Sequence, residues 1–213
     1  MKIIIFAYNR PDALLELLHE LKGYDITVID DHSAYDPTEH MKLCEYIRTQ
    51  PRRKYGFWKQ WQFAFDICRN SKHEYFLFIP DDYYDIDMTK LKRIKSTKPF
   101  MLHPTNFGTK KMWTNIQPQQ ATFCGISCLK VGFVDCTFYT NRITLELMEW
   151  TQPEVGWDWF VHKDMSSGVG WSQSHLLEKL EIPIYLPDKV LAHHGKWDSV
   201  MHPEHRKEIP LIC

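Results

Sequence analysis

Several features that define large classes of protein are missing from this sequence. No stretch of its 213 residues approaches the roughly 20 consecutive apolar residues that a membrane-spanning helix needs. Lysine and arginine (26) nearly balance aspartate and glutamate (27), so the formal net charge is only -1. Proteins that bind nucleic acid through its phosphates carry an excess of positive charge. We therefore expect neither a transmembrane segment nor a nucleic-acid partner.

The cysteines form no recognisable framework. Six of them are scattered along the chain, most of them inside apolar segments, where a thiol behaves as a small hydrophobic side chain. Cys124 and Cys128 lack a second pair of ligands at zinc-binding spacing. We expect all six to be reduced, which favours a cytoplasmic location. The single lysine and short apolar run of the opening MKIIIFAYNRPD predict a first strand and not a signal peptide.

Linkers, repeats and low-complexity tracts are also absent. The length and the 44% hydrophobic composition suit one α/β domain with a substantial core. Within residues 1–213, we expect a parallel sheet in the half 1–100 and more irregular segments in the half 101–213. The abrupt end at Leu211-Ile212-Cys213 suits either a natural terminus or a part of a longer, multidomain chain.

Strand-like and helix-like segments alternate in the first half, which predicts parallel strands joined by helices. Pro11 is placed to begin the first helix, and Gly23 is placed to end it. The segment 103–120 has little periodicity and is predicted to be a long loop. The predicted strands are 2–7, 26–29, 75–79, 100–102, 184–186 and 190–193, with strand-like alternation in 122–139. The predicted helices are 11–21, 37–48, 57–68, 89–95, 141–150 and 172–180.

Two adjacent carboxylates follow the most apolar of these strands. The strand from Tyr75 stops at Pro80, and Asp81 and Asp82 come next. We expect both at the edge of the sheet, outside the core. Neighbouring carboxylates repel unless they share a cation, and Mg²⁺ and Mn²⁺ favour oxygen ligands of this type. The alternative is an acidic, solvated turn, because aspartate is also a common turn residue.

Polar segments end three of the predicted strands: YNRP from Tyr8, VIDDHS from Val28 and PDD from Pro80. In this order they resemble the nucleotide-sugar-binding half of GT-A glycosyltransferases, particularly the large inverting family with TYNR, VDDGS and DDD segments. The likeness covers residues 1–100, and VDCTFYTNR, GWDW, SGVGWS and LAHHG follow the same fold more loosely. The whole run also resembles a glycosyltransferase domain of a large chlorella virus, which would place it in a host cytoplasm. Pro-Asp-Asp replaces the common Asp-x-Asp, and His32 replaces the usual glycine.

The resemblance implies a GT-A fold, in which helices flank a central, mostly parallel sheet and a UDP-sugar binds at the carboxyl ends of the strands. Ala7, Tyr8 and Asn9 would line the base and ribose. Asp31 would accept the uracil imide N–H, which favours uracil over cytosine. A turn or a helix cap is the alternative role for Asp30 and Asp31.

The resemblance also implies a Mn²⁺ or Mg²⁺ ion at the phosphates of the donor. Asp82 would bind the ion directly, and Asp81 would reach the ribose or the water shell of the ion. His194 would complete the site, unless it is one of a pair of surface histidines. Arg53 or Lys54 would add a positive contact to the phosphates, or would belong to a solvated surface loop.

Transfer to an acceptor hydroxyl needs a base. Asp158 is our candidate, because it opens a predicted helix and lies between Trp157 and Trp159, whose indoles suit stacking on sugars. An ordinary helix N-cap is the alternative. Asp135 is the second candidate, and would otherwise contact hydroxyls of the donor sugar.

Together, the motifs and the resemblance predict a metal-dependent hexosyltransferase that moves a sugar from a UDP-sugar to a glycan acceptor. The reaction would use an aspartate base and invert the configuration of the anomeric carbon. A sugar-1-phosphate nucleotidyltransferase is the second enzymatic alternative, but the glycine-rich, lysine-containing phosphate loop of such enzymes is absent after the first strand. A lectin-like module that stacks its eight tryptophans on sugars is the non-enzymatic alternative. That alternative leaves the three polar strand ends unexplained.

Overall fold

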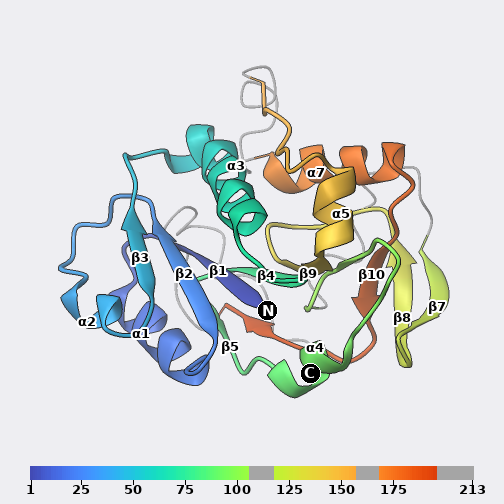
Figure 1. The fold of residues 1–213 in the computed structure, drawn as a ribbon, viewed down its shortest axis with the longest axis horizontal. Coiled ribbons are helices and arrows are strands. Elements are labelled where there is room, and N and C mark those ends of the chain that lie inside the picture. The colour runs from blue at the N-terminus through green and yellow to red at the C-terminus, as the bar shows by residue number, and fades with distance from the viewer. Residues whose placement is uncertain (106–117, 157–167, 196–213) are drawn as a thin grey trace.

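The computed structural model describes residues 1–105, 118–156 and 168–195. They form a nine-stranded sheet with helices on both faces and a separate two-stranded ladder (Figure 1). The strands are β1 (Lys2–Ala7), β2 (Asp25–Asp30), β3 (Glu45–Arg48), β4 (Tyr75–Pro80), β5 (Tyr83–Tyr84), β6 (Met101–Leu102), β7 (Gln119–Phe123), β8 (Ile126–Val131), β9 (Phe138–Asn141), β10 (Ile184–Pro187) and β11 (His193–His194). The helices are α1 (Pro11–Glu20), α2 (Thr38–Met41), α3 (Arg53–Asn70), α4 (Met88–Arg93), α5 (Arg142–Leu147) and α7 (Val169–Lys179).

Both halves of the chain contribute to the large sheet. The first half supplies β3, β2, β1 and β4, which are neighbours in that order and all parallel. The second half extends the sheet in the order β9-β6-β10-β8-β7. β9 and β8 run in the opposite direction to the other seven of the nine strands in this sheet. The predicted α/β class and the mostly parallel sheet are therefore confirmed.

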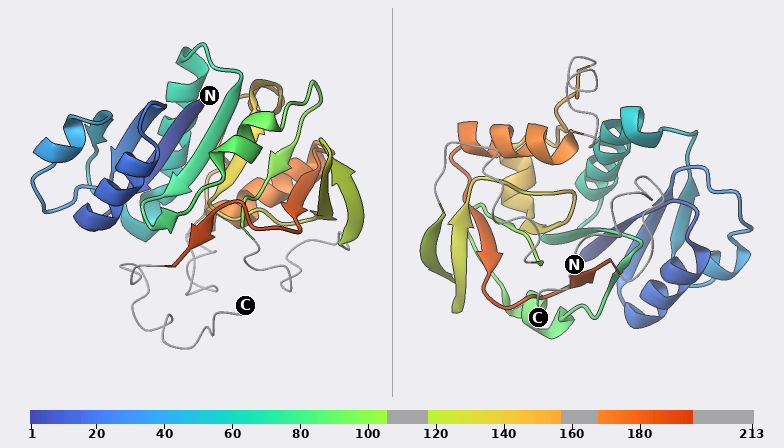
Figure 2. Two further views of the ribbon diagram at one scale, coloured as in Figure 1. Left: turned by 90° about the horizontal axis from the view of Figure 1, so that it is seen from below. Right: turned by 180° about the vertical axis from the view of Figure 1, so that it is seen from behind.

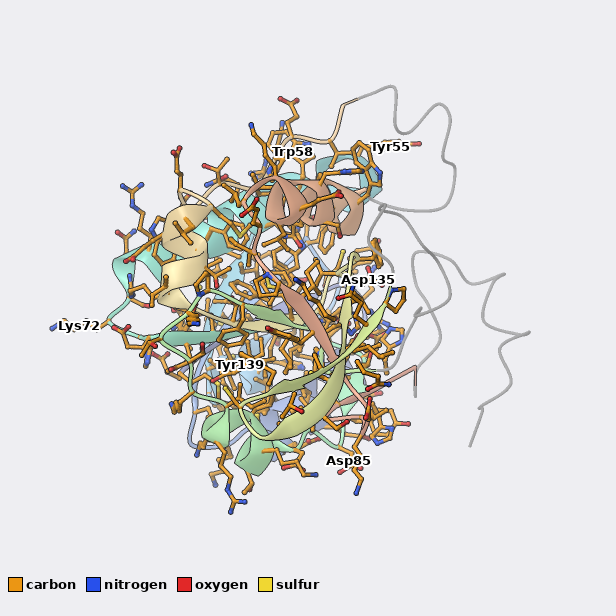
Figure 3. All side chains as sticks on the ribbon, turned by 90° about the vertical axis from the view of Figure 1, so that its right-hand side faces the viewer. Tyr55, Trp58, Lys72, Asp85, Asp135 and Tyr139 are labelled. Carbon is orange, nitrogen blue, oxygen red and sulfur yellow. The ribbon has the colours of Figure 1, made fainter. Side chains whose placement is uncertain are left out.

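The strand order changes direction at β1. β2 and β3 are added on one side of β1, and β4 is added on the other. Ligands of open α/β sheets bind at such a point, outside the carboxyl ends of the strands. In Figure 3, Asp85 and Asp135, which follow β5 and precede β9, lie toward one side of the molecule, and Lys72, which precedes β4, lies toward the other.

Alternate residues of the central strands enter two separate cores. Ile3 and Ile5 of β1 pack with α1 and α4, whereas Ile4 and Phe6 pack with α3, α5 and α7. Figure 2 shows these two sets of helices on opposite faces of the sheet. Burial on both faces is what the continuous apolar run of β1 predicts, and the predicted limits of this strand are confirmed.

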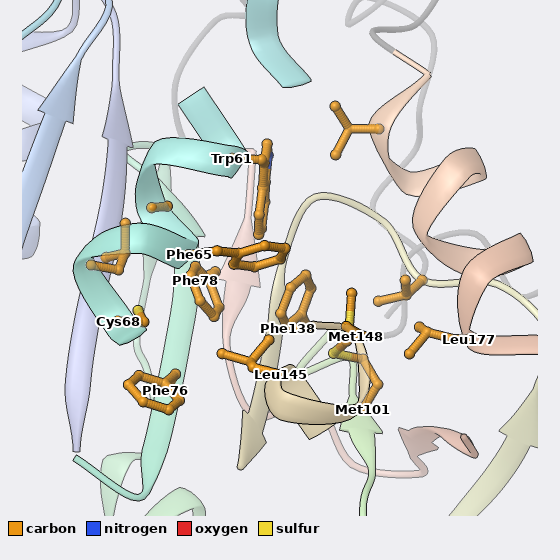
Figure 4. Packing of buried hydrophobic residues seen from close by; sticks show 14 of the residues in the cluster. Trp61, Phe65, Cys68, Phe76, Phe78, Met101, Phe138, Leu145, Met148 and Leu177 are labelled. Atoms are coloured by element: carbon orange, nitrogen blue, oxygen red, sulfur yellow. The ribbon is translucent and has the colours of Figure 1, made fainter. Parts of the chain in front are cut away.

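Aromatic rings fill the core beneath α3 (Figure 4). Trp61 is fully buried, and its ring centroid lies 4.5 to 5.8 Å from those of Phe6, Phe65, Phe78 and Phe138. Burial of side chains of this size contributes about 2–3 kcal/mol each. The aromatic stripe of α3 thus belongs to the core, as we expected, and Trp61 is not available for stacking on a sugar.

The predicted helix over 37–48 is wrong. The chain makes a single helical turn there, α2, and then the strand β3, which pairs with β2. Arg48 of β3 donates from Nε to the Asp30 carboxylate at 2.7 Å, and Glu45 accepts hydrogen bonds from Lys2 and Thr27. These contacts with distant residues outweigh the helical spacing of the segment.

The five cysteines in the described ranges are free thiols, as expected. Burial raises the pKa of the Cys68 thiol, so this residue stays protonated and acts as a core side chain. Within the described ranges, none of the helices combines the length and the apolar character needed to cross a bilayer.

Candidate active site

Asp81 and Asp82 lie at the carboxyl end of β4, directly after Pro80. Each has only 1% of its surface exposed. The prediction that they lie at the sheet edge is confirmed, but the prediction that they lie outside the core is wrong. They are buried because Arg10, from the turn after β1, and His194, from β11, pack against them.

Arg10 bridges the two carboxylates. Its Nη2 lies 2.6 Å from Oδ1 of Asp81, and its Nη1 lies 2.6 Å from Oδ2 of Asp82. The Tyr8 N–H also donates to Oδ2 of Asp81, at 2.9 Å. Burial raises the pKa of Asp81 to about 7, although Arg10 opposes the shift. Within the described part of the chain, the guanidinium of Arg10 thus lies between two buried carboxylates.

The ladder of β5 and β11 brings a histidine to the same place. His194 pairs with Tyr83 in this ladder, and its Nε2 lies 3.3 Å from Oδ2 of Asp82. The preceding residue, His193, lies on the other face of the ladder, 3.7 Å from Asp85. Of the two histidines, the structure thus brings His194 to the buried carboxylates.

The cluster suits a divalent cation that shares its coordination with a ligand. Among the residues that the structure describes, no three His, Cys, Asp or Glu side chains are grouped closely enough to hold a metal ion. Asp82 and His194 offer a carboxylate and an imidazole, which Mn²⁺ accepts, and Mg²⁺ is commonly bound by one or two carboxylates together with substrate phosphates. Asp81 is engaged by Arg10 and the Tyr8 N–H, so it would act in the shell around the ion.

Asp30 and Asp31, at the end of β2, have different surroundings. Asp30 is fully buried and pairs with Arg48, so it stabilises the sheet. Asp31 is 7% exposed, accepts a hydrogen bond from the Arg52 N–H at 2.5 Å, and donates its own N–H to the carbonyl of the buried Ala7. Asp31 therefore lies beside the turn after β1, close to the point where the strand order changes.

The turn after β1 is tied to the neighbouring strand ends. Asn9 has a φ of 51°, in the left-handed region that asparagine tolerates better than most residues. Its N–H donates to Ser33 Oγ at 2.8 Å, and its side chain accepts from the Ala34 N–H at 2.8 Å. Together with the hydrogen bond from Tyr8 to Asp81, these contacts make the turn a rigid part of the sheet edge.

Asp135 reaches the same edge from the second half of the chain. It lies just before β9, which starts where the antiparallel β4 ends. The Val134 N–H donates to Ser174 of α7 at 2.9 Å. A Cβ at Gly170 would lie 2.7 Å from the Val134 carbonyl oxygen and 3.4 Å from Oδ1 of Asp135. The glycine thus permits the close approach of α7 that positions Asp135.

Three predicted residues cannot be placed in the site. Asp158, the first candidate for the base, lies outside the described residues. Arg53 and Lys54 are the first residues of α3, but their side chains lie outside what the structure describes. Conversely, Arg10 and His103 lie at this edge without having been predicted as site residues. Arg10 belongs to the YNRP segment, whose position after a strand was the available signal.

Comparisons with known proteins identify no family. No family model matches the chain, and no curated protein matches it significantly. Among solved structures, the chain is similar to a protein from Desulfovibrio desulfuricans G20 that is provisionally named a nucleotide-diphospho-sugar transferase. The TM-score is 0.46 and the sequence identity 7%, over 87% of this chain and 78% of that chain. A likeness this distant carries no weight for function, and none of the comparisons bears on a viral source.

Proposed function

We propose that this protein is a metal-dependent glycosyltransferase of GT-A type, which moves a sugar from a UDP-sugar to a carbohydrate acceptor. The observation that supports this most is the buried pair Asp81 and Asp82, bridged by Arg10, at the point where the strand order changes. Sheets of this kind bind phosphorylated ligands there. A carboxylate pair at that point suits a cation that also binds a diphosphate.

The donor would lie along the carboxyl edge of the sheet. Uridine would occupy the side of β2 and β1, where Asp31 suits the uracil imide N–H. The diphosphate would face Arg10, Asp82 and His194 at β4, and the sugar would extend toward β9 and β6. These strands follow in the order β2-β1-β4-β9-β6. Four inter-strand steps span roughly 19 Å, which is room for an extended nucleotide sugar.

The leaving diphosphate gains negative charge as the glycosidic bond breaks. A Mn²⁺ or Mg²⁺ ion, when bound, would stabilise that charge more in the transition state than in the ground state. Asp82 and His194 would hold the ion beside the phosphates. Arg10 carries a second positive charge at the same point, and Asp81 fixes the guanidinium there.

An aspartate would take the proton from the acceptor hydroxyl as its oxygen attacks the anomeric carbon. Attack from the face opposite UDP inverts the configuration at that carbon. Asp158 is the first candidate for this base. Asp135 is the second, because it lies at the edge where the sugar would be bound, and its other role would be to bind sugar hydroxyls.

Isothermal titration calorimetry with UDP, with and without Mn²⁺, tests the proposal. We expect UDP binding that requires Mn²⁺, that Asp82→Asn abolishes and that Asp85→Asn leaves intact. Asp85 is a matched control, because its side chain is 82% exposed and its φ of 49° suits asparagine. UDP binding that is indifferent to Mn²⁺ would contradict the proposal.

Release of UDP from a donor tests the base. Asp158→Asn is expected to bind UDP normally and to lose turnover. Full turnover by this variant would exclude Asp158, and the same assay on Asp135→Asn would then decide whether Asp135 takes its place.

A further inference from the structure

His103 is a buried side chain at the carboxyl edge that the proposed mechanism does not use. It directly follows β6, and 3% of its surface is exposed. β6 and β4 are both antiparallel to β9, so they run toward the same edge of the sheet, two strands apart. The titratable side chains that act on the His103 ring are Asp135 and His194. His103 therefore lies on the β9–β6 side of the carboxylate cluster.

One ring nitrogen of His103 lacks a partner. Nδ1 lies 3.1 Å from the carbonyl oxygen, 3.2 Å from the hydroxyl and 3.3 Å from the backbone nitrogen of Thr105, so it faces both an acceptor and a donor. Nε2 is buried and has no hydrogen-bond partner within the described parts of the chain. Folded proteins contain few buried polar atoms without a hydrogen-bond partner. Such an atom destabilises the fold, because it loses its hydrogen bonds to water on burial and forms none in their place.

The chemistry of the missing partner follows from the two tautomers of the ring. If Nδ1 of His103 carries the proton, Nε2 must accept a hydrogen bond; if Nε2 carries it, Nε2 must donate one. A hydroxyl group satisfies both tautomers, because it donates and accepts. A phosphate oxygen would satisfy only the second.

The His103 ring contacts the Thr105 hydroxyl, and the Asp135 carboxylate and the His194 imidazole also act on it. Tyr83 is 5% exposed, and Thr105 and Thr137, the two hydroxyl side chains that act on it, are also buried. The Tyr83 ring packs against His194, with centroids 4.9 Å apart. This surface combines hydroxyl and imidazole groups with one carboxylate, that of Asp135, and such a combination suits an uncharged, hydroxyl-rich ligand.

We infer that Nε2 of His103 binds a hydroxyl of the donor sugar, in a subsite that His103 shares with Tyr83 and Thr137. This inference rests on the proposed function. If uracil lies at β2 and the diphosphate at β4, the sugar continues over β9 and β6, and β6 ends at His103. Asp135, which precedes β9, lies on the same path.

Calorimetry in the presence of Mn²⁺ tests the inference through the difference between two ligands. UDP-glucose, UDP-galactose and UDP-N-acetylglucosamine are compared with UDP to find the sugar that the wild type binds more tightly than UDP alone. His103→Phe keeps a ring of similar size without polar nitrogens. It is expected to weaken that UDP-sugar about tenfold or more and to change the affinity for UDP less than about twofold. His103→Gln, which restores a polar group, is expected to recover part of the loss.

The outcomes separate this inference from the proposed function. Equal weakening of UDP and UDP-sugar by His103→Phe would overturn the inference, since the histidine would then support the nucleotide site or the fold. An unchanged affinity for the UDP-sugar would overturn it too, because a buried water would then satisfy Nε2. A wild type that prefers none of the UDP-sugars to UDP also contradicts it. If the wild type does not bind UDP, the result contradicts the proposed function itself. If His103→Phe does not fold, as judged by thermal melting, His103→Gln is judged by the same difference, with a smaller loss expected.

Discussion

Two His–Asp pairs lie on opposite faces of the β5–β11 ladder. His194 and Asp82 are 3.3 Å apart, and their side chains are 24% and 2% exposed. His193 and Asp85 are 3.7 Å apart, and their side chains are 47% and 82% exposed. Successive residues of a strand point to opposite faces, so a step of one residue in β11 separates the two arrangements. The same two residue types form a candidate metal site on one face and a surface pair on the other.

The two pairs differ in their charged neighbours and not in their chemistry. Asp82 is buried with a second carboxylate, Asp81, and with Arg10. Charges in such surroundings interact strongly, and removing one partner leaves another uncompensated. An exposed ion pair is screened by water and contributes about 0–1 kcal/mol. We call His194 and Asp82 the inner pair, and His193 and Asp85 the outer pair. Substitutions at the inner pair should therefore have large effects on activity and stability, and the same substitutions at the outer pair should have almost none.

The largest effect is expected when the aspartate of the inner pair, Asp82, is neutralised, with the same substitution at Asp85 as the control. Asp82→Asn removes the carboxylate that would hold the cation, and a cation at a leaving diphosphate contributes several kcal/mol to transition-state stabilisation. We expect UDP release from the donor to fall about 100-fold or more. Asp85→Asn should stay within about twofold of the wild type. Equal activities of the two variants would contradict the claim that only the inner pair takes part in the reaction.

Removal of Arg10 tests the charge balance of the inner pair. Arg10→Ala removes the guanidinium that bridges two buried carboxylates, and we expect it to lower the free energy of unfolding by about 3 kcal/mol in urea. Added Mn²⁺ should restore part of this loss, because it supplies the missing positive charge. Lys42→Ala, which breaks the exposed Lys42–Glu39 pair, should cost less than about 1 kcal/mol and should not respond to Mn²⁺. An Arg10→Ala protein whose stability is unaffected by Mn²⁺ would contradict the proposed site.

The histidines give a smaller contrast. His194→Ala should weaken Mn²⁺ binding in the presence of UDP by about tenfold to a hundredfold, because it removes one protein ligand of the ion. His193→Ala should leave it unchanged. Titration of Mn²⁺, followed by calorimetry, gives both values. A similar loss in both variants would indicate that the ladder, and not His194 itself, supports the ion.

The smallest effect is expected at a third His–Asp pair, on the opposite edge of the sheet. His73 and Asp25 are 2.7 Å apart at the start of β2. Partial burial would raise the pKa of Asp25, but hydrogen bonds from Lys2 and His73 outweigh it and hold this pKa below its usual value of 3.8. The folded state therefore favours the charged carboxylate, so the stabilisation is present above pH 3.8 and is lost as the pH falls below it.

Urea unfolding of Asp25→Asn and the wild type checks this sign. The variant should be less stable than the wild type at pH 7, and the difference should shrink toward pH 3. Binding of Mn²⁺ should be unaffected. A difference that grows as the pH falls would show that the pKa is shifted in the other direction.

Local sequence patterns predict the centre of the molecule well. β1 and β4 are continuous apolar runs, and Pro80 ends the second of them, so their limits and the position of Asp81 and Asp82 follow from neighbouring residues alone. The burial of the aspartates does not, because Arg10 and His194 lie far from them in the sequence. The strand β3 was missed for the same reason: its formation depends on pairing with β2 and on the contact between Arg48 and Asp30.

The second half of the site is harder to predict. Asp135 was a candidate only through a resemblance, and nothing local shows that Gly170 of α7 holds it at the edge. His103 is the first residue of a segment that the sequence predicts to be a long loop. Its place beside the cluster follows from the order β4-β9-β6, which no short segment of the sequence encodes. The positions of Asp135 and His103 therefore depend on packing between elements that are distant in the sequence, which local patterns do not specify.

The central claim is that a cation bound at Asp82 neutralises the diphosphate of a nucleotide sugar. A crystal structure with Mn²⁺ and UDP, with anomalous diffraction to locate the metal, tests it most directly. We predict an anomalous peak bonded to the Asp82 carboxylate and to the diphosphate, beside His194, and no peak at Asp85 and His193. A peak at the outer pair, or UDP bound with no metal at Asp82, would contradict the claim.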